Sequence, residues 1–267
     1  MRVHPLLLLL LSVHVVAAQS VSTQIGARAN GIGYASASLF DTWSIFNNVA
    51  GLAKVDKASV GFTYDLHPST SGANRTAAVF ALPTPVGVAG IGAYRFGDQL
   101  YNEHIISAGF ANKFGLAALG AQINYIQYTA DGFGTKGVAS VNLGGIAELT
   151  PRLFIGAYVI NVNQPNISGE EKLPTKLIAG LGIKPIDKVI IAAEIEKDLN
   201  YDPTWKMGIE YFFHKKICAR TGYNLHPNTA FFGLGFKTSK FTIDYAIQHS
   251  ILLSLSHQAS VGYQFSK

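Results

Sequence analysis

The sequence has little cysteine and little charge. Cys218 is the single cysteine of the 267 residues, so the chain forms no internal disulfide. We expect this residue to pack within a strand rather than to act as a nucleophile. Charged residues make up 14% of the chain, whereas about a quarter is usual in soluble proteins. Because hydrophobic residues make up 48%, a surface that faces lipid would account for the balance.

Long apolar runs are also missing, except at the N-terminus. Residues 1–18 combine the positive charge of Arg2, a short apolar run and small residues at positions 16–18. This pattern is typical of a secretory signal peptide, here cleaved before Gln19. The run is shorter than the ~20 residues that a membrane helix requires, and no later run is long enough. A mature protein that spans a membrane would therefore do so as a β-barrel.

Catalytic and metal-binding motifs are absent as well. The sequence contains no HExxH, no CxxC and no phosphate-binding glycine loop, and no histidine lies in a motif that would activate a nucleophile. We therefore expect no enzymatic activity, no catalytic or metal site and no cofactor. The net charge is +5 without a basic patch that contains interleaved aromatic residues, so we expect no nucleic-acid partner.

What the sequence does contain is alternation. Between residues 188 and 248, apolar residues occupy every second position of consecutive segments; Trp205 and Met207, for example, alternate with Lys206 and Gly208. A period of two indicates β-strands, because successive side chains of a strand point to opposite faces. Soluble sandwiches and outer-membrane barrels both contain such strands, but the barrels turn the apolar face toward lipid.

Strand length and aromatic residues favour the barrel. Each segment is about ten residues long, close to the ~9–11 residues that a tilted strand needs to cross the hydrocarbon layer. Aromatic residues gather toward the ends of the apolar face, as in the girdles that outer-membrane barrels place at the lipid headgroups. The residues expected in this lipid-facing girdle are Trp205, Tyr211, Phe213, Tyr223, Phe241, Tyr245, Tyr263 and Phe265.

Fourteen such segments follow residue 58, and an even number is usual in single-chain bacterial barrels. Their connections alternate between tight turns and longer loops, and tight turns of such barrels face the periplasm. The sequence therefore predicts an all-β protein, a closed antiparallel transmembrane β-barrel over residues 58–267. We expect it in the bacterial outer membrane, with its C-terminus in the periplasm.

Residues 19–57 do not alternate, and we call them the plug. Thr42 to Ala53 is predicted to form a short helix with Asp41 as a candidate N-cap. A helical or irregular segment of this kind in front of a barrel can fold into its lumen. The other interpretation is an arm in the periplasm.

The polar face of the C-terminal half is expected to form a charged wall inside the barrel. Opposite charges on adjacent strands attract one another and satisfy each other's hydrogen bonds. Two interpretations stay open: a polar conduit or ligand site, or a closed lumen whose charges are paired. The residues expected on this lumen-facing charged wall are Lys176, Lys184, Glu194, Glu196, Lys206, Glu210, Arg220, Lys237 and Asp244.

Two short segments carry a resemblance to a known family. Residues 27–38 (ARANGIGYASAS) and 47–53 (NNVAGLA) resemble the N-terminal region of FadL-like outer-membrane barrels, particularly the PorV/PorQ branch of Bacteroidetes. The resemblance implies a fourteen-stranded barrel with an N-terminal plug. Its motif positions in this sequence are Arg28, Asn30, Gly31, Asn48, Ala50, Gly51 and Leu52.

The resemblance implies two different functions. PorV and PorQ members serve type IX protein secretion, whereas FadL-type members pass hydrophobic molecules through the barrel. Because the outer loops are short, we expect a non-enzymatic component or scaffold of protein secretion. The alternative is a channel for uptake of small hydrophobic molecules. The expected partners are outer-membrane lipid, together with other secretion-system proteins or a small hydrophobic ligand.

Overall fold

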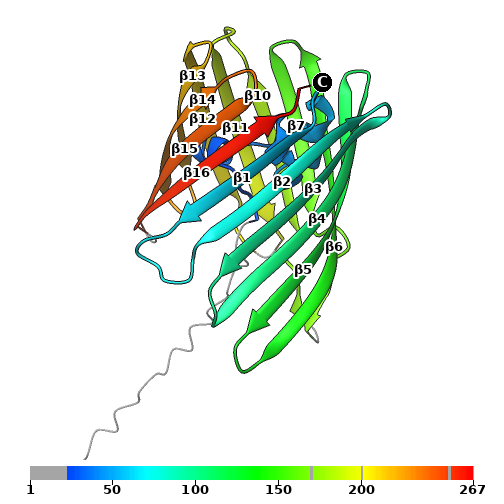
Figure 1. Cartoon of the computed structure of the whole chain (residues 1–267), viewed down its shortest axis with the longest axis vertical. Coiled ribbons are helices and arrows are strands. Elements are labelled where there is room, and N and C mark those ends of the chain that lie inside the picture. Colours follow the sequence, from blue (N-terminus) through cyan, green and yellow to red (C-terminus); the bar gives the residue numbers. More distant parts are fainter. Residues whose placement is uncertain (1–22, 169–170, 200, 252–253, 267) are drawn as a thin grey trace, which may run out of the picture.

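The computed structural model describes residues 23–168, 171–199, 201–251 and 254–266; the expected signal peptide, residues 1–18, lies outside them. Fourteen antiparallel strands form one closed barrel, which confirms the predicted fold class (Figure 1). The barrel strands are β1 (Ser59–Leu66), β2 (Arg75–Thr84), β3 (Gly87–Gly97), β4 (Tyr101–Phe114), β5 (Ala117–Ala130), β6 (Gly134–Thr150), β7 (Leu153–Ile160), β10 (Lys176–Ile183), β11 (Val189–Asp198), β12 (Thr204–His214), β13 (Ile217–Asn224), β14 (Thr229–Lys237), β15 (Phe241–Ser250) and β16 (Ser254–Gln264).

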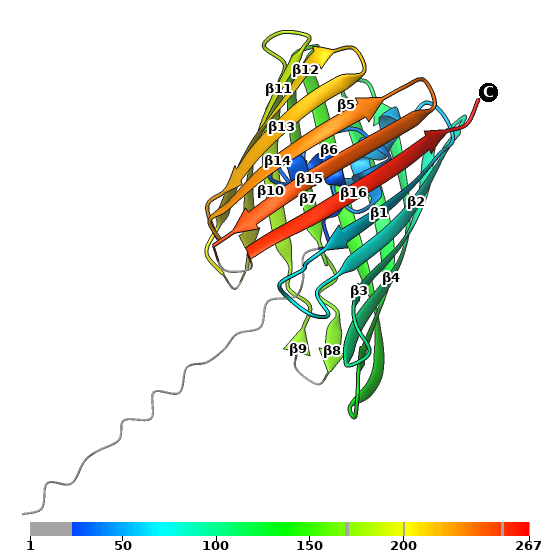
Figure 2. The ribbon, with the colours of Figure 1, turned by 60° about the vertical axis from the view of Figure 1, so that its left-hand side comes forward.

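Strand order in the barrel follows chain order. Between β7 and β10 the chain forms a separate hairpin of β8 (Asn166–Ser168) and β9 (Glu171–Lys172), which projects from one end (Figure 2). Its strands are too short to show a period in the sequence, so alternation does not predict them. The barrel closes where β1 pairs with β16. The short turns lie at the end that carries the C-terminus (Figure 1); we call this the short-turn end and the opposite one the loop end.

The outer face of the barrel is apolar. Ile191, Ile209 and Leu234 point outward with 39%, 44% and 58% of their surface exposed, as expected of strands that face lipid. The aromatic residues expected in the girdle also lie on this face. They are exposed, apart from Tyr263, which is half-buried and packs against the rings of Phe241 and Phe265.

The described part of the plug, residues 23–57, lies inside the barrel (Figure 2). It contains the short helix α1 (Ala27–Gly31) and two 3₁₀-helices, η1 (Thr42–Ile45) and η2 (Val49–Lys54). The single helix predicted over 42–53 is therefore wrong. Asp41 caps η1, but Asn48 starts a new helix because its Oδ1 accepts a hydrogen bond from the Ala50 N–H at 3.2 Å. Among the described residues, no helix is long and apolar enough to cross a membrane.

The plug packs differently on the two sides of the lumen. On the side of β2–β6 the contact is apolar, and it forms the main hydrophobic core of the protein. This wall has small residues where the plug lies close; a Cβ at Gly120 would come within 2.9 Å of the Val49 and Ala50 backbone. The plug residues of this core are Ile25, Trp43, Ile45, Phe46, Val49, Leu52 and Val55. On the side of β10–β16, most contacts with the plug are polar or charged, and small apolar clusters form at Ile178 and Phe231.

Candidate functional site

The charged residues expected on the lumenal wall do not form one continuous row. Lys184 and Lys237 lie apart from the others, near the short-turn end. The Lys184 Nζ lies 4.9 Å from the centre of the Phe154 ring, and Lys237 is exposed. The remaining residues form two ion-paired clusters, and each cluster also binds the plug.

Arg28 of the plug is the centre of the first cluster, which we call the arginine latch. Its Nη2 lies 2.8 Å from Glu210 Oε2, and its Nη1 lies 3.2 Å from Asp41 Oδ2. Glu210 Oε1 also accepts a hydrogen bond from Arg220 Nε at 2.7 Å, and Arg220 Nη1 pairs with Asp244 Oδ1 at 2.7 Å. Burial alone would lower the pKa of Arg28, but the charges of Glu210 and Asp41 outweigh burial and raise it. The guanidinium therefore stays charged.

Lys206 is the centre of the second cluster. It is 5% exposed, and its Nζ lies 3.1 Å from Glu194 Oε1 and 2.5 Å from Glu196 Oε2. The same Nζ donates to Gln24 Oε1 of the plug at 2.7 Å, while Glu196 also pairs with Lys176 at 3.0 Å. Three carboxylate or amide oxygens thus surround one ammonium group, which can donate three hydrogen bonds.

Glu194 joins this cluster to the plug backbone. Its Oε2 accepts hydrogen bonds from the N–H groups of Ser36 and Ala37 at 3.0 and 2.8 Å. Hydrogen bonds to an ionised acceptor are stronger than those between neutral groups. A carboxylate of the wall therefore fixes this part of the plug.

The motif residues of the plug have structural contacts in the lumen. Asn30 donates to Gln258 Oε1 at 2.9 Å, and Asn48 donates to the carbonyl oxygens of Ala37 and Gly145 at 2.7 and 3.1 Å. Ala50 and Leu52 are completely buried. Gly31 and Gly51 lie where space is limited; a Cβ at Gly51 would overlap the Leu39 carbonyl and Ser44.

Two further anchors of the plug are absent from the sequence-based set of site residues. Asp65 and Arg75 form a buried ion pair between β1 and β2, and Arg75 Nη2 also donates to the Tyr34 hydroxyl of the plug at 3.0 Å. The sequence does contain a signal for this ion pair, because the two opposite charges lie on consecutive strands of one hairpin. The structure shows that the two residues are register partners.

The other anchor lies at the seam, where β1 meets β16. The Ala27 N–H donates to Ser260 Oγ at 2.8 Å, and Ser260 Oγ donates to Thr63 Oγ1 at the same distance. Ser260 belongs to β16 and Thr63 to β1. One chain of hydrogen bonds therefore links the plug to both strands that close the barrel.

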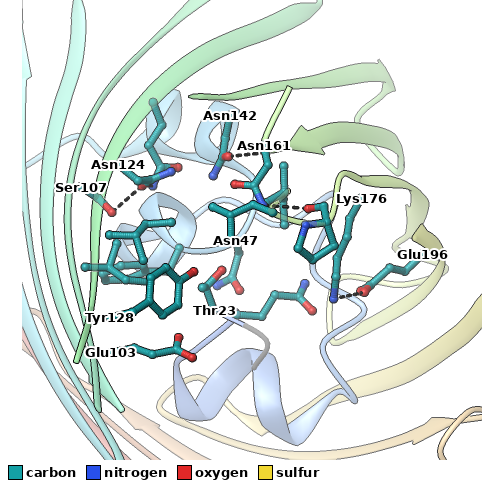
Figure 3. Close-up of a pocket in the computed structure, with 18 residues that line it drawn as sticks. Thr23, Asn47, Glu103, Ser107, Asn124, Tyr128, Asn142, Asn161, Lys176 and Glu196 are labelled. Atoms are coloured by element: carbon teal, nitrogen blue, oxygen red, sulfur yellow. Dashed lines mark hydrogen bonds and ion pairs between the residues drawn. The ribbon is translucent and has the colours of Figure 1, made fainter. Parts of the chain in front are cut away.

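The plug separates two cavities. The loop-end cavity has a volume of about 50 Å³ and is lined by plug residues such as Phe46 and Asn47 and by side chains of β4, β5 and β10 (Figure 3). The short-turn cavity has a volume of about 360 Å³ and lies between the arginine latch and the wall around Lys216 and Tyr263. Within the described ranges, no group of three or more His, Cys, Asp or Glu side chains could hold a metal ion.

Solved structures with the same architecture are transport channels. The chain is similar to the CymD monoaromatic hydrocarbon channel (TM-score 0.73, 12% identity, 92% of this chain and 99% of that chain). It is also similar to the toluene transporter TbuX of Ralstonia pickettii (TM-score 0.70, 13%, 92% and 99%) and to a FadL homologue of Pseudomonas aeruginosa (TM-score 0.67, 12%, 92% and 100%). The chain has the fold of FadL-like barrels. No family model and no curated protein matches the sequence.

Proposed function

We propose that the protein is an outer-membrane channel of the FadL-like type, in which the plug controls the passage of small hydrophobic molecules. The observation that carries this proposal is the division of the lumen by a plug that is held mainly by ion pairs and hydrogen bonds on one wall and mainly by apolar packing on the other. The solved channels of the same fold, which carry monoaromatic hydrocarbons or toluene, support this substrate class.

The apolar exterior supports the location in a membrane. A Lys or Arg that faces mid-bilayer lipid costs about 2–4 kcal/mol, and Ile191, Ile209 and Leu234 are outward-facing apolar residues of β11, β12 and β14. In the proposed orientation, the short-turn end and the C-terminus face the periplasm.

The two cavities suggest where passage is controlled. An engineered apolar cavity of about 150 Å³ accommodates benzene, so the short-turn cavity, at about 360 Å³, has room for a single aromatic ring. The loop-end cavity, at about 50 Å³, does not. In this proposal a ring-sized molecule enters from the loop end only when the plug shifts relative to the charged wall.

Uptake of radiolabelled toluene by intact bacteria tests this proposal. The host should lack its own FadL-like channels. Without them, background uptake of toluene is limited by its slow passage through the lipopolysaccharide layer of the outer membrane. We expect expression of the protein to raise the initial uptake rate. The matched control is a Phe133→Arg variant, which changes a loop side chain that is 90% exposed and should transport like the wild type. Equal uptake with and without a correctly inserted barrel would contradict the proposal.

The secretion role expected from the PorV/PorQ resemblance stays a prediction without structural support. Co-purification of other outer-membrane proteins with this barrel would be its test.

A further inference from the structure

We propose that the loop-end cavity is a binding site for a small primary ammonium group, with Glu103 as its counter-ion. The site is defined by equilibrium binding, so it goes beyond the proposed channel and does not depend on passage. Glu103 lies on β4, and the cavity brings it together with residues of the plug and of β5 (Figure 3).

Glu103 differs from four other buried carboxylates of the lumen. The carboxylates of Asp65, Glu194, Glu210 and Asp244 each contact an Arg or Lys side chain. Glu103 is 4% exposed, and its Oε1 accepts a hydrogen bond from the Tyr101 hydroxyl at 2.8 Å. Within the described part of the chain it forms no ion pair. An unpaired buried charge is costly and is relieved either by protonation or by a positively charged partner, and in this proposal a ligand takes the second role.

Asn47 of the plug also lines this cavity. Its Nδ2 donates to the carbonyl oxygens of Ile25 and Trp43, both at 3.1 Å, which fixes the orientation of the amide. Its Oδ1 is buried and has no hydrogen-bond partner among the described residues. An ammonium group carries three donors and no acceptor, so its hydrogen-bonding capacity matches a lining that offers carboxylate and amide oxygens.

The charge and volume of the cavity narrow the ligand class. The one cation that lines it, Lys176, is already paired with Glu196, so an anionic ligand would meet two carboxylates and no free cation in the lining. A volume of about 50 Å³ is far below the about 150 Å³ that accommodates benzene. The ring of a monoaromatic hydrocarbon is therefore excluded.

The apolar residues of the lining can contact the alkyl part of the ligand. Phe46, Ile105, Ile126 and Leu173 give the cavity an apolar side, against which one or two methylene groups can pack. A divalent metal ion is a poorer occupant, because Ca²⁺ needs six to eight oxygen ligands and Mg²⁺ usually keeps several waters. A short alkylammonium ion fits the charge, the donors and the volume together.

The test is isothermal titration calorimetry of the full barrel in detergent, with ethylammonium chloride at constant ionic strength. Millimolar ligand is needed, because a ligand of three non-hydrogen atoms binds weakly. We expect saturable binding of ethylammonium. Tetramethylammonium, which has the same charge but is too large and carries no N–H donor, should not bind, and neither should ethanol. Equal binding of all three, or no saturable binding of ethylammonium, would overturn the inference.

A matched pair of variants assigns the site to Glu103. In Glu103→Gln we expect binding to weaken about tenfold or more, because a charged hydrogen-bond partner is lost. The control is Asp131→Asn, which neutralises an exposed carboxylate in the neighbouring loop and should bind like the wild type. Heat-modifiable migration reports whether each variant is folded. If Glu103→Gln does not fold, the ligand series on the wild type still decides. Toluene uptake is measured separately, so loss of uptake with intact ethylammonium binding would contradict the channel alone.

Discussion

The arginine latch makes a quantitative prediction about how firmly the plug is held. In Arg28→Met the wall residue Glu210 loses the two hydrogen bonds that Arg28 donates to it, at 3.1 and 2.8 Å, but it keeps Arg220 as a partner. The carboxylate is therefore not left unpaired. The Arg28 side chain is 21% exposed, so water screens part of the interaction. A hydrogen bond to a charged group contributes about 1.5–3 kcal/mol. We therefore expect the substitution to reduce the free energy that stabilises the closed position of the plug by about 2 kcal/mol.

Single-channel conductance in a planar bilayer measures this loss. A change of about 2 kcal/mol corresponds to an about 30-fold rise in the ratio of open to closed barrels. A variant that lacks residues 23–57 gives the conductance of the fully open lumen. The control, Lys237→Met, removes a charge near the short-turn end that is exposed and pairs with no acidic group in the structure's described ranges. If the deletion conducts but Arg28→Met opens no more often than Lys237→Met, the latch does not hold the plug.

Three further predictions concern the plug, the lipid face and a loop. Gly51→Ala should expose the plug to added protease, because the new Cβ overlaps Leu39 and Ser44, whereas a Cβ at Gly262 meets nothing closer than 3.8 Å and Gly262→Ala should stay resistant. Ile209→Arg should destabilise the inserted barrel by about 2–4 kcal/mol in urea titrations from liposomes, while Phe133→Arg in a loop should not; equal stability of the two would mean that the assignment of faces is wrong. Backbone hydrogen bonds from Tyr101 and Leu100 lower the pKa of Asp98, so their contribution is present above the ordinary value of 3.8 and is lost as the pH falls through the lowered pKa. The protection of the Leu100 amide from exchange, relative to the free amide at the same pH, should therefore fall only in that acidic range, and a fall in protection near neutral pH would contradict this.

The barrel could be predicted because the face on which each side chain lies follows from the sequence of its own strand. Alternation along each strand follows from one side of the sheet facing lipid and the other facing the lumen, so residues such as Ile209 and Lys206 reveal their faces without any partner. Pairs on adjacent strands follow nearly as directly, since Glu194 and Lys206 are register partners. The outward position of the aromatic residues expected in the girdle, and the lumenal position of most charged residues expected on the wall, follow from the same pattern.

The contacts of the plug were not predictable in the same way. Arg28 and Glu210 are 182 residues apart, and nothing in the local sequence of either residue names the other. Glu103 was missed for a related reason. A single carboxylate on a strand is ordinary in a sequence, and it becomes notable only when the plug covers it and the described lumen offers it no cation.

The hydrogen-bond chain from Ala27 through Ser260 to Thr63 has a consequence for the order of assembly. The plug is synthesised first, yet part of its binding surface is formed by β16, which is synthesised last. β1 and β16 complete that surface only when they pair, so a plug that lies in the lumen as the cylinder closes contacts both strands of the seam. In that order of events the N-terminal segment would act as a template on which the two ends of the sheet meet, and a chain without it would close its cylinder with one fewer set of contacts at the final pairing.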